Sequence, residues 1–183
     1  INKVFTEIYD AWNSDTFFSL IKAFELPTNN QIKTFSRGMR MKAALTIALS
    51  HDAKLLILDE ATAGMDVSGR EHVLEILEDY LGDDRAILIS SHISEDIEQL
   101  ATQLVFMRDG RIILKESKEV LLSQYGIIDQ PVEHFNISNE YLIATRRRND
   151  RQISLVNNYQ KVPDAQPLKT IDDATKIIMR GEV

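Results

Sequence analysis

Two short, continuously apolar runs constrain the fold of this chain more than any other feature. Residues 55–58 read Leu-Leu-Ile-Leu and residues 86–89 read Ala-Ile-Leu-Ile, without alternating polar side chains. Strands buried on both faces of a parallel sheet have this pattern. Helical periodicity over residues 37–49 and 68–81 supplies the kind of crossover that parallel strands require. The sequence therefore predicts an α/β fold with a mainly parallel core sheet.

Further elements are predicted around this core. Apolar residues recur at helical spacing over residues 2–24, with a break at residues 13–15. Ser68 and Glu71 form a capping-box pair, which predicts that a helix opens at Ser68. Asp109-Gly110 predicts a hairpin turn between two strands.

The pattern of predicted strands and helices changes after Gly126, and this change predicts the domain organisation. Residues 1–126 are expected to form the main domain, and residues 127–183 a small appended α+β region. Within the appended region we expect strands at residues 140–145 and 152–156 and a final helix at residues 171–180.

Composition excludes several classes of protein. The chain has no cysteine, which excludes a disulfide framework, a cysteine-ligated zinc site and a thiol nucleophile. Its net charge of −7 argues against nucleic acid as a partner. No apolar run approaches the roughly 20 residues that span a bilayer, so we expect a soluble chain. The absence of cysteine fits the cytoplasm.

Three chemically active side chains stand at the carboxyl ends of the two predicted strands. Asp59 and Glu60 end the first strand, and His92 follows the second. The carboxyl ends of neighbouring parallel strands share one edge, where ligands bind. We expect Asp59 to hold Mg²⁺ through water, Glu60 to polarise an attacking water and His92 to contact a transferred phosphate. Taken singly, these motifs also fit a solvated acidic turn and a surface histidine.

Two glycine-containing segments add to this pattern. Residues 36–39 open a predicted helix, where free backbone N–H groups, the Ser36 hydroxyl and Gly38 favour a bound anion. Gly64 permits a tight turn directly after the acid pair, and Asp66 is expected to reach toward a partner subunit. A plain serine N-cap and an ordinary loop are the alternative interpretations.

Together and in this order, these segments resemble the ATP-binding subunit of an ABC (ATP-binding cassette) transporter over about residues 2–125. Phe35–Met39 is similar to the signature loop, which faces ATP bound by the opposite subunit. Leu55–Glu60 is similar to the Walker B strand, and Ala61–Asp66 to the D-loop. The resemblance implies a part of a P-loop ATPase, with a helical subdomain before Thr34 and a nucleotide-binding core.

The resemblance also implies roles for individual residues. Asp59 would lie on the metal side, Glu60 would be the catalytic base and His92 the switch histidine, with ATP and Mg²⁺ as cofactors. The implied cofactor-binding residues are Ser36, Arg37, Gly38, Met39 and Asp66. The implied partners are a second nucleotide-binding subunit, identical or different, and a transmembrane permease. The implied location of the ATPase is cytoplasmic, peripheral at the inner face of the cell membrane.

Departures from the usual signature indicate a subfamily. Arg37 stands where the family usually has glycine, and Met39 where it usually has glutamine. Such variants resemble bacterial exporters of drugs and antimicrobial peptides. The resemblance therefore implies an ATPase that drives export.

Two family motifs, the P-loop and the glutamine loop, are absent from the chain. The P-loop pattern is Gly, four residues, then Gly-Lys-Ser/Thr, and none of the seven glycines is followed by lysine. Because the chain also begins with Ile1, we expect it to be the C-terminal portion of a longer ATPase. Removing the P-loop strand would leave an apolar sheet edge, which favours self-association.

We expect the 183-residue chain alone neither to bind Mg-ATP tightly nor to hydrolyse it, because the P-loop lysine and its backbone N–H groups hold the phosphates. Titration calorimetry with Mg-ATP checks this expectation. Binding in the micromolar range would contradict it.

Two other functions stay open at this level. The first is an ATPase head of the chromosome-maintenance or DNA-repair (SMC) type, although no heptad coiled coil precedes Thr34. The second is a non-catalytic interaction module without a P-loop. DNA-stimulated hydrolysis would favour the first, and the intact Asp59, Glu60 and His92 argue against the second.

Overall fold

A computed structural model describes residues 1–182 and resolves two compact units, Ile1–Leu100 and the residues from Ala101 onward. The N-terminal unit alternates helices and strands. Its elements are α1 (Asn2–Ile8), α2 (Ser14–Ala23), α3 (Arg37–Leu49), β1 (Leu55–Asp59), α4 (Val67–Tyr80), β2 (Ala86–Ser90) and α5 (Ser94–Leu100), with a short 3₁₀ turn at Ile32–Thr34.

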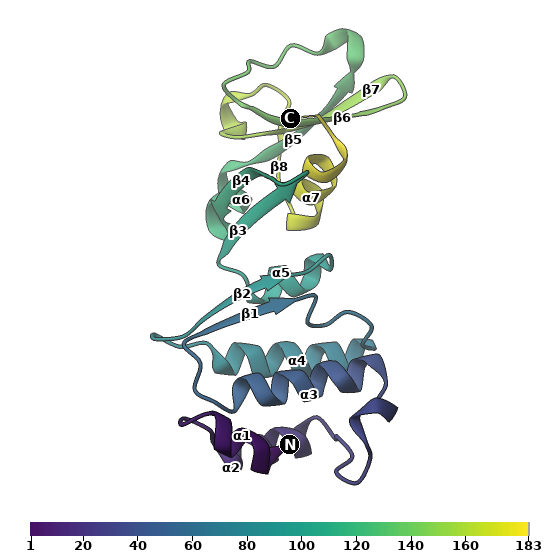
Figure 1. Ribbon diagram of the computed structural model, residues 1–183. Coiled ribbons are helices and arrows are strands. Elements are labelled where there is room, and N and C mark those ends of the chain that lie inside the picture. Colours follow the sequence, from purple (N-terminus) through teal and green to yellow (C-terminus); the bar gives the residue numbers. More distant parts are fainter. Residues whose placement is uncertain (183) are drawn as a thin grey trace. The chain divides into compact units, whose positions relative to one another are not determined.

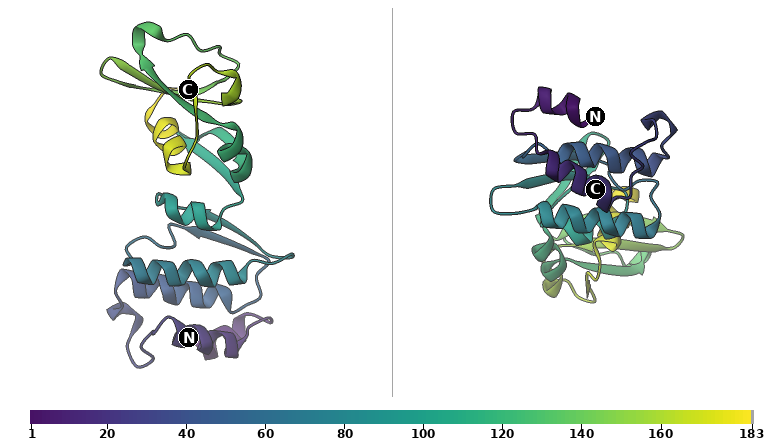
Figure 2. Two further views of the ribbon diagram at one scale, coloured as in Figure 1. Left: turned by 180° about the vertical axis from the view of Figure 1, so that it is seen from behind. Right: turned by 90° about the horizontal axis from the view of Figure 1, so that it is seen from below.

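The two apolar runs form a parallel pair, as their pattern predicts. β1 and β2 pair in register from Leu55 opposite Ala86 to Asp59 opposite Ser90. α3 and α4 lie side by side on one face of this pair (Figures 1 and 2). The register places the carboxyl ends of both strands at one edge of the sheet.

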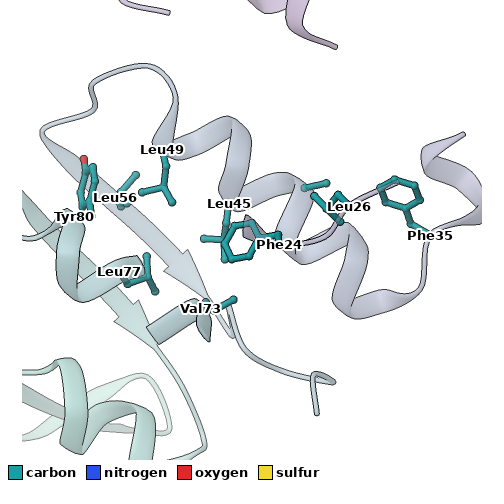
Figure 3. Close-up of a cluster of buried hydrophobic side chains, with 10 residues drawn as sticks. Phe24, Leu26, Phe35, Leu45, Leu49, Leu56, Val73, Leu77 and Tyr80 are labelled. Carbon is teal, nitrogen blue, oxygen red and sulfur yellow. The ribbon is translucent and has the colours of Figure 1, made fainter. Parts of the chain in front are cut away.

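The core of the N-terminal unit lies between this sheet face and the helices (Figure 3). Val73 and Leu77 of α4 have no exposed surface, and Leu45 of α3 retains 2 %. The other large members of this cluster are Phe24, Leu26, Phe35, Leu49, Leu56 and Tyr80. Each such side chain contributes about 1.5–3 kcal/mol when it leaves water.

The opposite face of the β1–β2 pair is apolar and exposed. Leu55 and Ile57 of β1 are 53 % and 71 % exposed, and Leu88 of β2 is 59 % exposed. The prediction that both faces of these strands are buried is therefore wrong for the described residues. The apolar pattern records a preference for burial, whereas the packing of residues 1–100 covers only the face toward α3 and α4.

The caps of α3 and α4 differ in how well the sequence predicts them. The Ser36 hydroxyl accepts a hydrogen bond from the Met39 N–H at 3.2 Å, as a serine N-cap should. The predicted start at Ser68 is wrong, because Asp66 caps α4 instead and accepts from the Gly69 N–H at 3.2 Å. A Cβ at Gly69 would stand only 2.6 Å from Asp66 Oδ1, so glycine there makes room for the cap.

The C-terminal unit contains two antiparallel sheets and two α-helices. Its elements are β3 (Gln103–Arg108), β4 (Arg111–Ser117), α6 (Lys118–Gln124), β5 (Gly126–Pro131), β6 (Leu142–Arg148), β7 (Arg151–Val156), β8 (Gln166–Pro167) and α7 (Ile171–Arg180), with 3₁₀ turns at Val132–His134 and Tyr159–Lys161. β3 and β4 form the predicted hairpin, and the larger sheet has the order β6-β7-β5-β8. Parallel pairing in residues 1–182 is therefore confined to β1 and β2.

The β3–β4 hairpin belongs to the C-terminal unit. The Arg108 guanidinium donates to the carbonyl oxygens of Ile178 and Gly181 at 2.6 and 2.5 Å, which ties the end of β3 to the end of α7. The structure consequently divides the chain after Leu100, not after residue 126. The boundary at residue 126 was predicted from a change in the local sequence pattern. Such a pattern contains no information about contacts between residues that are distant in the sequence.

No helix within residues 1–182 combines the length and the apolar character that crossing a membrane requires.

Candidate functional site

The site begins where β1 and β2 end, and Ser90 contacts the Asp59 carboxylate and the Glu60 backbone. The Ser90 hydroxyl donates to Asp59 Oδ1 at 2.5 Å. The Glu60 N–H donates to the Ser90 carbonyl oxygen at 3.1 Å and lies 3.3 Å from the Ser90 hydroxyl oxygen. Both acids are thus fixed to the neighbouring strand.

The backbone changes direction at Glu60. Its φ of 51° lies in the left-handed region, which a residue with a Cβ adopts at a cost of about 1–2 kcal/mol. A turn follows, in which the Ala63 N–H donates to the Glu60 carbonyl oxygen at 3.0 Å and the Met65 N–H to that of Thr62 at 3.2 Å. Strain of this kind in a structure is a reason to look for function at the residue that carries it.

His92 is joined to Glu60. His92 Nδ1 lies 2.5 Å from Glu60 Oε2, and the two side chains are 72 % and 36 % exposed. A histidine that contacts a carboxylate through Nδ1 keeps Nε2 for a second partner. The predicted meeting of the acid pair and the histidine at one edge of the sheet is observed.

The start of α3 lies against the turn that follows the acid pair. A Cβ at Gly38 would lie 3.6 Å from Met65 Cγ and 3.8 Å from the Gly64 carbonyl oxygen. A Cβ at Gly64 would lie 3.0 Å from Cδ of Arg37, so this arginine lies across the turn. Gly64 has a φ of 80°, which glycine adopts without strain.

The remaining predicted site residues lie on or beside these elements. Ser36 and Met39 make the α3 cap, and the Asp66 carboxylate caps α4. The structure therefore forms two groups: the acids with His92, and the start of α3 with the 61–66 turn. One carboxylate oxygen of Asp66 therefore already accepts a hydrogen bond within the same chain.

Two oxygen-bearing side chains of the site are of the kind that binds Mg²⁺. The Asp59 carboxylate and the Ser90 hydroxyl are oxygen donors, which Mg²⁺ prefers. Among residues 1–182, however, no three His, Cys, Asp or Glu side chains gather closely enough to hold a metal ion by themselves.

Several polar residues around the site were not predicted from the sequence. Three of them carry hydroxyl groups at or just after the strand ends: Ser90, Ser91 and Thr62. Their closeness in the sequence to the acids and to His92 could have indicated them. Asp96 and Arg70 gave no signal, since charged residues on helices are usually solvated.

Comparison with known proteins shows a similarity to one family. Residues 6–63 match the family described as ABC transporter. The lantibiotic transport ATP-binding protein SrtF of Streptococcus pyogenes is 37 % identical over 116 residues, covering 63 % of this chain and 47 % of the relative. The linearmycin resistance ATP-binding protein LnrL of Bacillus subtilis is 32 % identical over 120 residues, covering 64 % and 38 %.

Solved structures agree on the fold. The ATP-binding subunit of an ABC transporter has a TM-score of 0.54 at 23 % identity, covering 60 % of this chain and 48 % of that one. A dimeric ATP-binding cassette in a post-hydrolysis state with ADP and Pi has a TM-score of 0.51 at 18 % identity, covering 56 % and 46 %.

The chain shares the α/β fold of the ATP-binding cassettes of ABC transporters. The matched segment, residues 6–63, is similar to the ABC transporter family, and the curated relatives that the chain resembles are named as ATP-binding proteins. The chain spans less than half the length of the two curated relatives described above.

Proposed function

We propose that this chain is part of the ATP-hydrolysing subunit of an ABC exporter, in which ATP binding and hydrolysis drive a separate membrane permease. The observation that carries the proposal is the contact between Glu60 and His92 beside Asp59, at the carboxyl ends of two parallel strands. A base, a histidine and a metal-binding carboxylate are the parts that phosphoryl transfer to water needs at one place.

Each of these residues has a distinct role in the proposal. Glu60 polarises the attacking water, and the Nδ1 contact orients the His92 ring so that Nε2 faces the γ-phosphate. Asp59, held by Ser90, would hold Mg²⁺. When bound there, the ion would supply positive charge that offsets the charge of the phosphates.

The signature segment acts on a second nucleotide site. Ser36, Gly38 and the backbone N–H groups at the start of α3 would face the γ-phosphate of ATP held by a partner subunit. Arg37 lies across Gly64, which mechanically links this segment to the turn after the acids. Two such subunits, identical or different, would enclose two ATP molecules.

The P-loop that holds ATP in this family is not among the residues of this chain. The proposal therefore assigns hydrolysis to the full-length protein and inactivity to the chain alone. The names of the relatives, which mention lantibiotic transport and linearmycin resistance, support antimicrobial compounds as the cargo. The proposal also assigns the protein to the cytoplasmic face of the membrane, where the permease would hold it.

Hydrolysis by the full-length protein, purified with its permease in lipid vesicles, tests the proposal. We expect Mg²⁺-dependent ATP hydrolysis that EDTA abolishes and that duplex DNA leaves unchanged. Stimulation by DNA would favour an ATPase head of the chromosome-maintenance or DNA-repair type. A natural protein that lacks the P-loop and shows no hydrolysis would favour the interaction module.

A further inference from the structure

A buried carboxylate outside the site joins the two loops that carry Glu60 and His92. Asp96 of α5 has no exposed surface, and its Oδ2 accepts a hydrogen bond from the Thr62 hydroxyl. The same oxygen accepts a hydrogen bond from the Ser91 hydroxyl at 3.1 Å. Thr62 lies two residues after Glu60, and Ser91 directly precedes His92. One oxygen atom therefore holds both loops.

The other oxygen of this carboxylate faces a cation from a third element. Arg70 of α4 places its Nε 3.4 Å from Asp96 Oδ1, and the arginine side chain is 23 % exposed. A buried carboxylate is unfavourable unless hydrogen bonds and an opposite charge compensate it. Asp96 has both kinds of partner.

The Ser91 hydroxyl is itself held in place. Its oxygen accepts a hydrogen bond from the Ile93 N–H at 3.0 Å, so its proton is directed to Asp96. The neighbouring backbone is equally enclosed, since Ala61 and Ala63 on either side of Thr62 are 1 % and 5 % exposed. The Asp96 carboxylate thus accepts both of its hydrogen bonds, from Thr62 and Ser91, through Oδ2, whereas Oδ1 and Arg70 Nε face each other as an ion pair without a hydrogen bond.

We propose that Asp96 is a positioning residue, which sets the distance between Glu60 and His92 by holding Thr62 and Ser91 on a single carboxylate oxygen. Asp96 touches neither reacting group and acts through the two loops. The claim that Asp96 affects hydrolysis rests on the proposed function. The claim that Asp96 fixes the geometry of the two loops does not.

Amide hydrogen exchange in the 183-residue chain tests the geometric part. Thr62→Val removes the hydroxyl and keeps the shape of the side chain. We expect the Glu60 N–H, which bonds to Ser90, to exchange at least tenfold faster in this variant. Asp96→Asn, which removes the charge opposite Arg70, should act in the same direction.

Thr46→Val is the matched control. Thr46 is also fully buried, and its hydroxyl bonds to the Lys42 carbonyl oxygen at 2.9 Å within α3, away from the network. We expect this variant to leave the Glu60 N–H exchange unchanged relative to that of core amides. Thr62→Ser, which restores a hydroxyl, should restore protection. Equal acceleration in Thr62→Val and Thr46→Val would overturn the proposal.

Kinetics of the full-length protein test the catalytic consequence. Thr62→Val should lower kcat at least tenfold with little change in KM for ATP, because the nucleotide-binding groups stay in place while Glu60 and His92 lose their mutual position. An unchanged kcat would overturn the catalytic consequence. If the wild-type protein hydrolyses no ATP, the proposed function fails, and the exchange comparison still decides whether Asp96 positions the loops.

Discussion

Glu60→Gln in the full-length protein is expected to lower ATP turnover at least 100-fold and to make an ATP-bound dimer accumulate. Glutamine keeps the shape of the side chain and the backbone demand at a φ of 51°, but cannot take a proton from water. General-base catalysis contributes about 10²–10⁴-fold to such reactions. Steady-state phosphate release and sizing in the presence of Mg-ATP measure the two effects.

Glu75→Gln provides the control for this substitution. Glu75 lies on the exposed side of α4 and undergoes the same chemical change. Its turnover should equal that of the wild type. If Glu60→Gln also keeps near-normal turnover, Glu60 is not the base, and the assignment of the site to water activation fails.

Ile178→Ala is expected to destabilise the C-terminal unit by about 2–5 kcal/mol. Ile178 of α7 has no exposed surface and lies in the apolar stripe that this helix turns toward the sheet, together with Ile171, Ala174 and Ile177. Truncation removes buried methylene groups and leaves a cavity. The denaturant dependence of amide exchange at Leu155 and Val156 reports the stability of this unit.

The adjacent residue supplies the comparison. Met179 is 44 % exposed on the same helix, so Met179→Ala should change the stability by no more than about 0.5 kcal/mol. Similar losses for both substitutions would mean that α7 is not packed as described. The pair thus separates burial from helix propensity, since both variants introduce alanine into α7.

Much of the candidate site could be predicted from the sequence because it depends on local signals. An apolar run followed by two acids predicts a strand with carboxylates at its tip, and a second run followed by His92 predicts a neighbour. Parallel pairing then brings the tips together, as the 2.5 Å contact between His92 and Glu60 confirms. The hairpin at Asp109-Gly110 was predictable for the same reason, since both residues have positive φ.

Other features depend on contacts that no local pattern records. Asp96 stands in an acidic first turn beside Glu95, where a solvated carboxylate is the ordinary expectation. Its burial is decided by Arg70 and Thr62, which are far away in sequence. The α4 cap was missed because Asp66 and Ser68 are both capable of capping, and the glycine at 69 favours the aspartate.

The hydrogen bonds from Arg108 to the end of α7 indicate where two related chains can be joined by recombination. A recombination point near residue 126 would separate the β3–β4 hairpin from the carbonyl oxygens of Ile178 and Gly181 that its arginine binds. A point near residue 100 would carry the hairpin, its arginine and α7 together. Chimeras of related ATPases joined at that earlier point inherit an intact C-terminal unit.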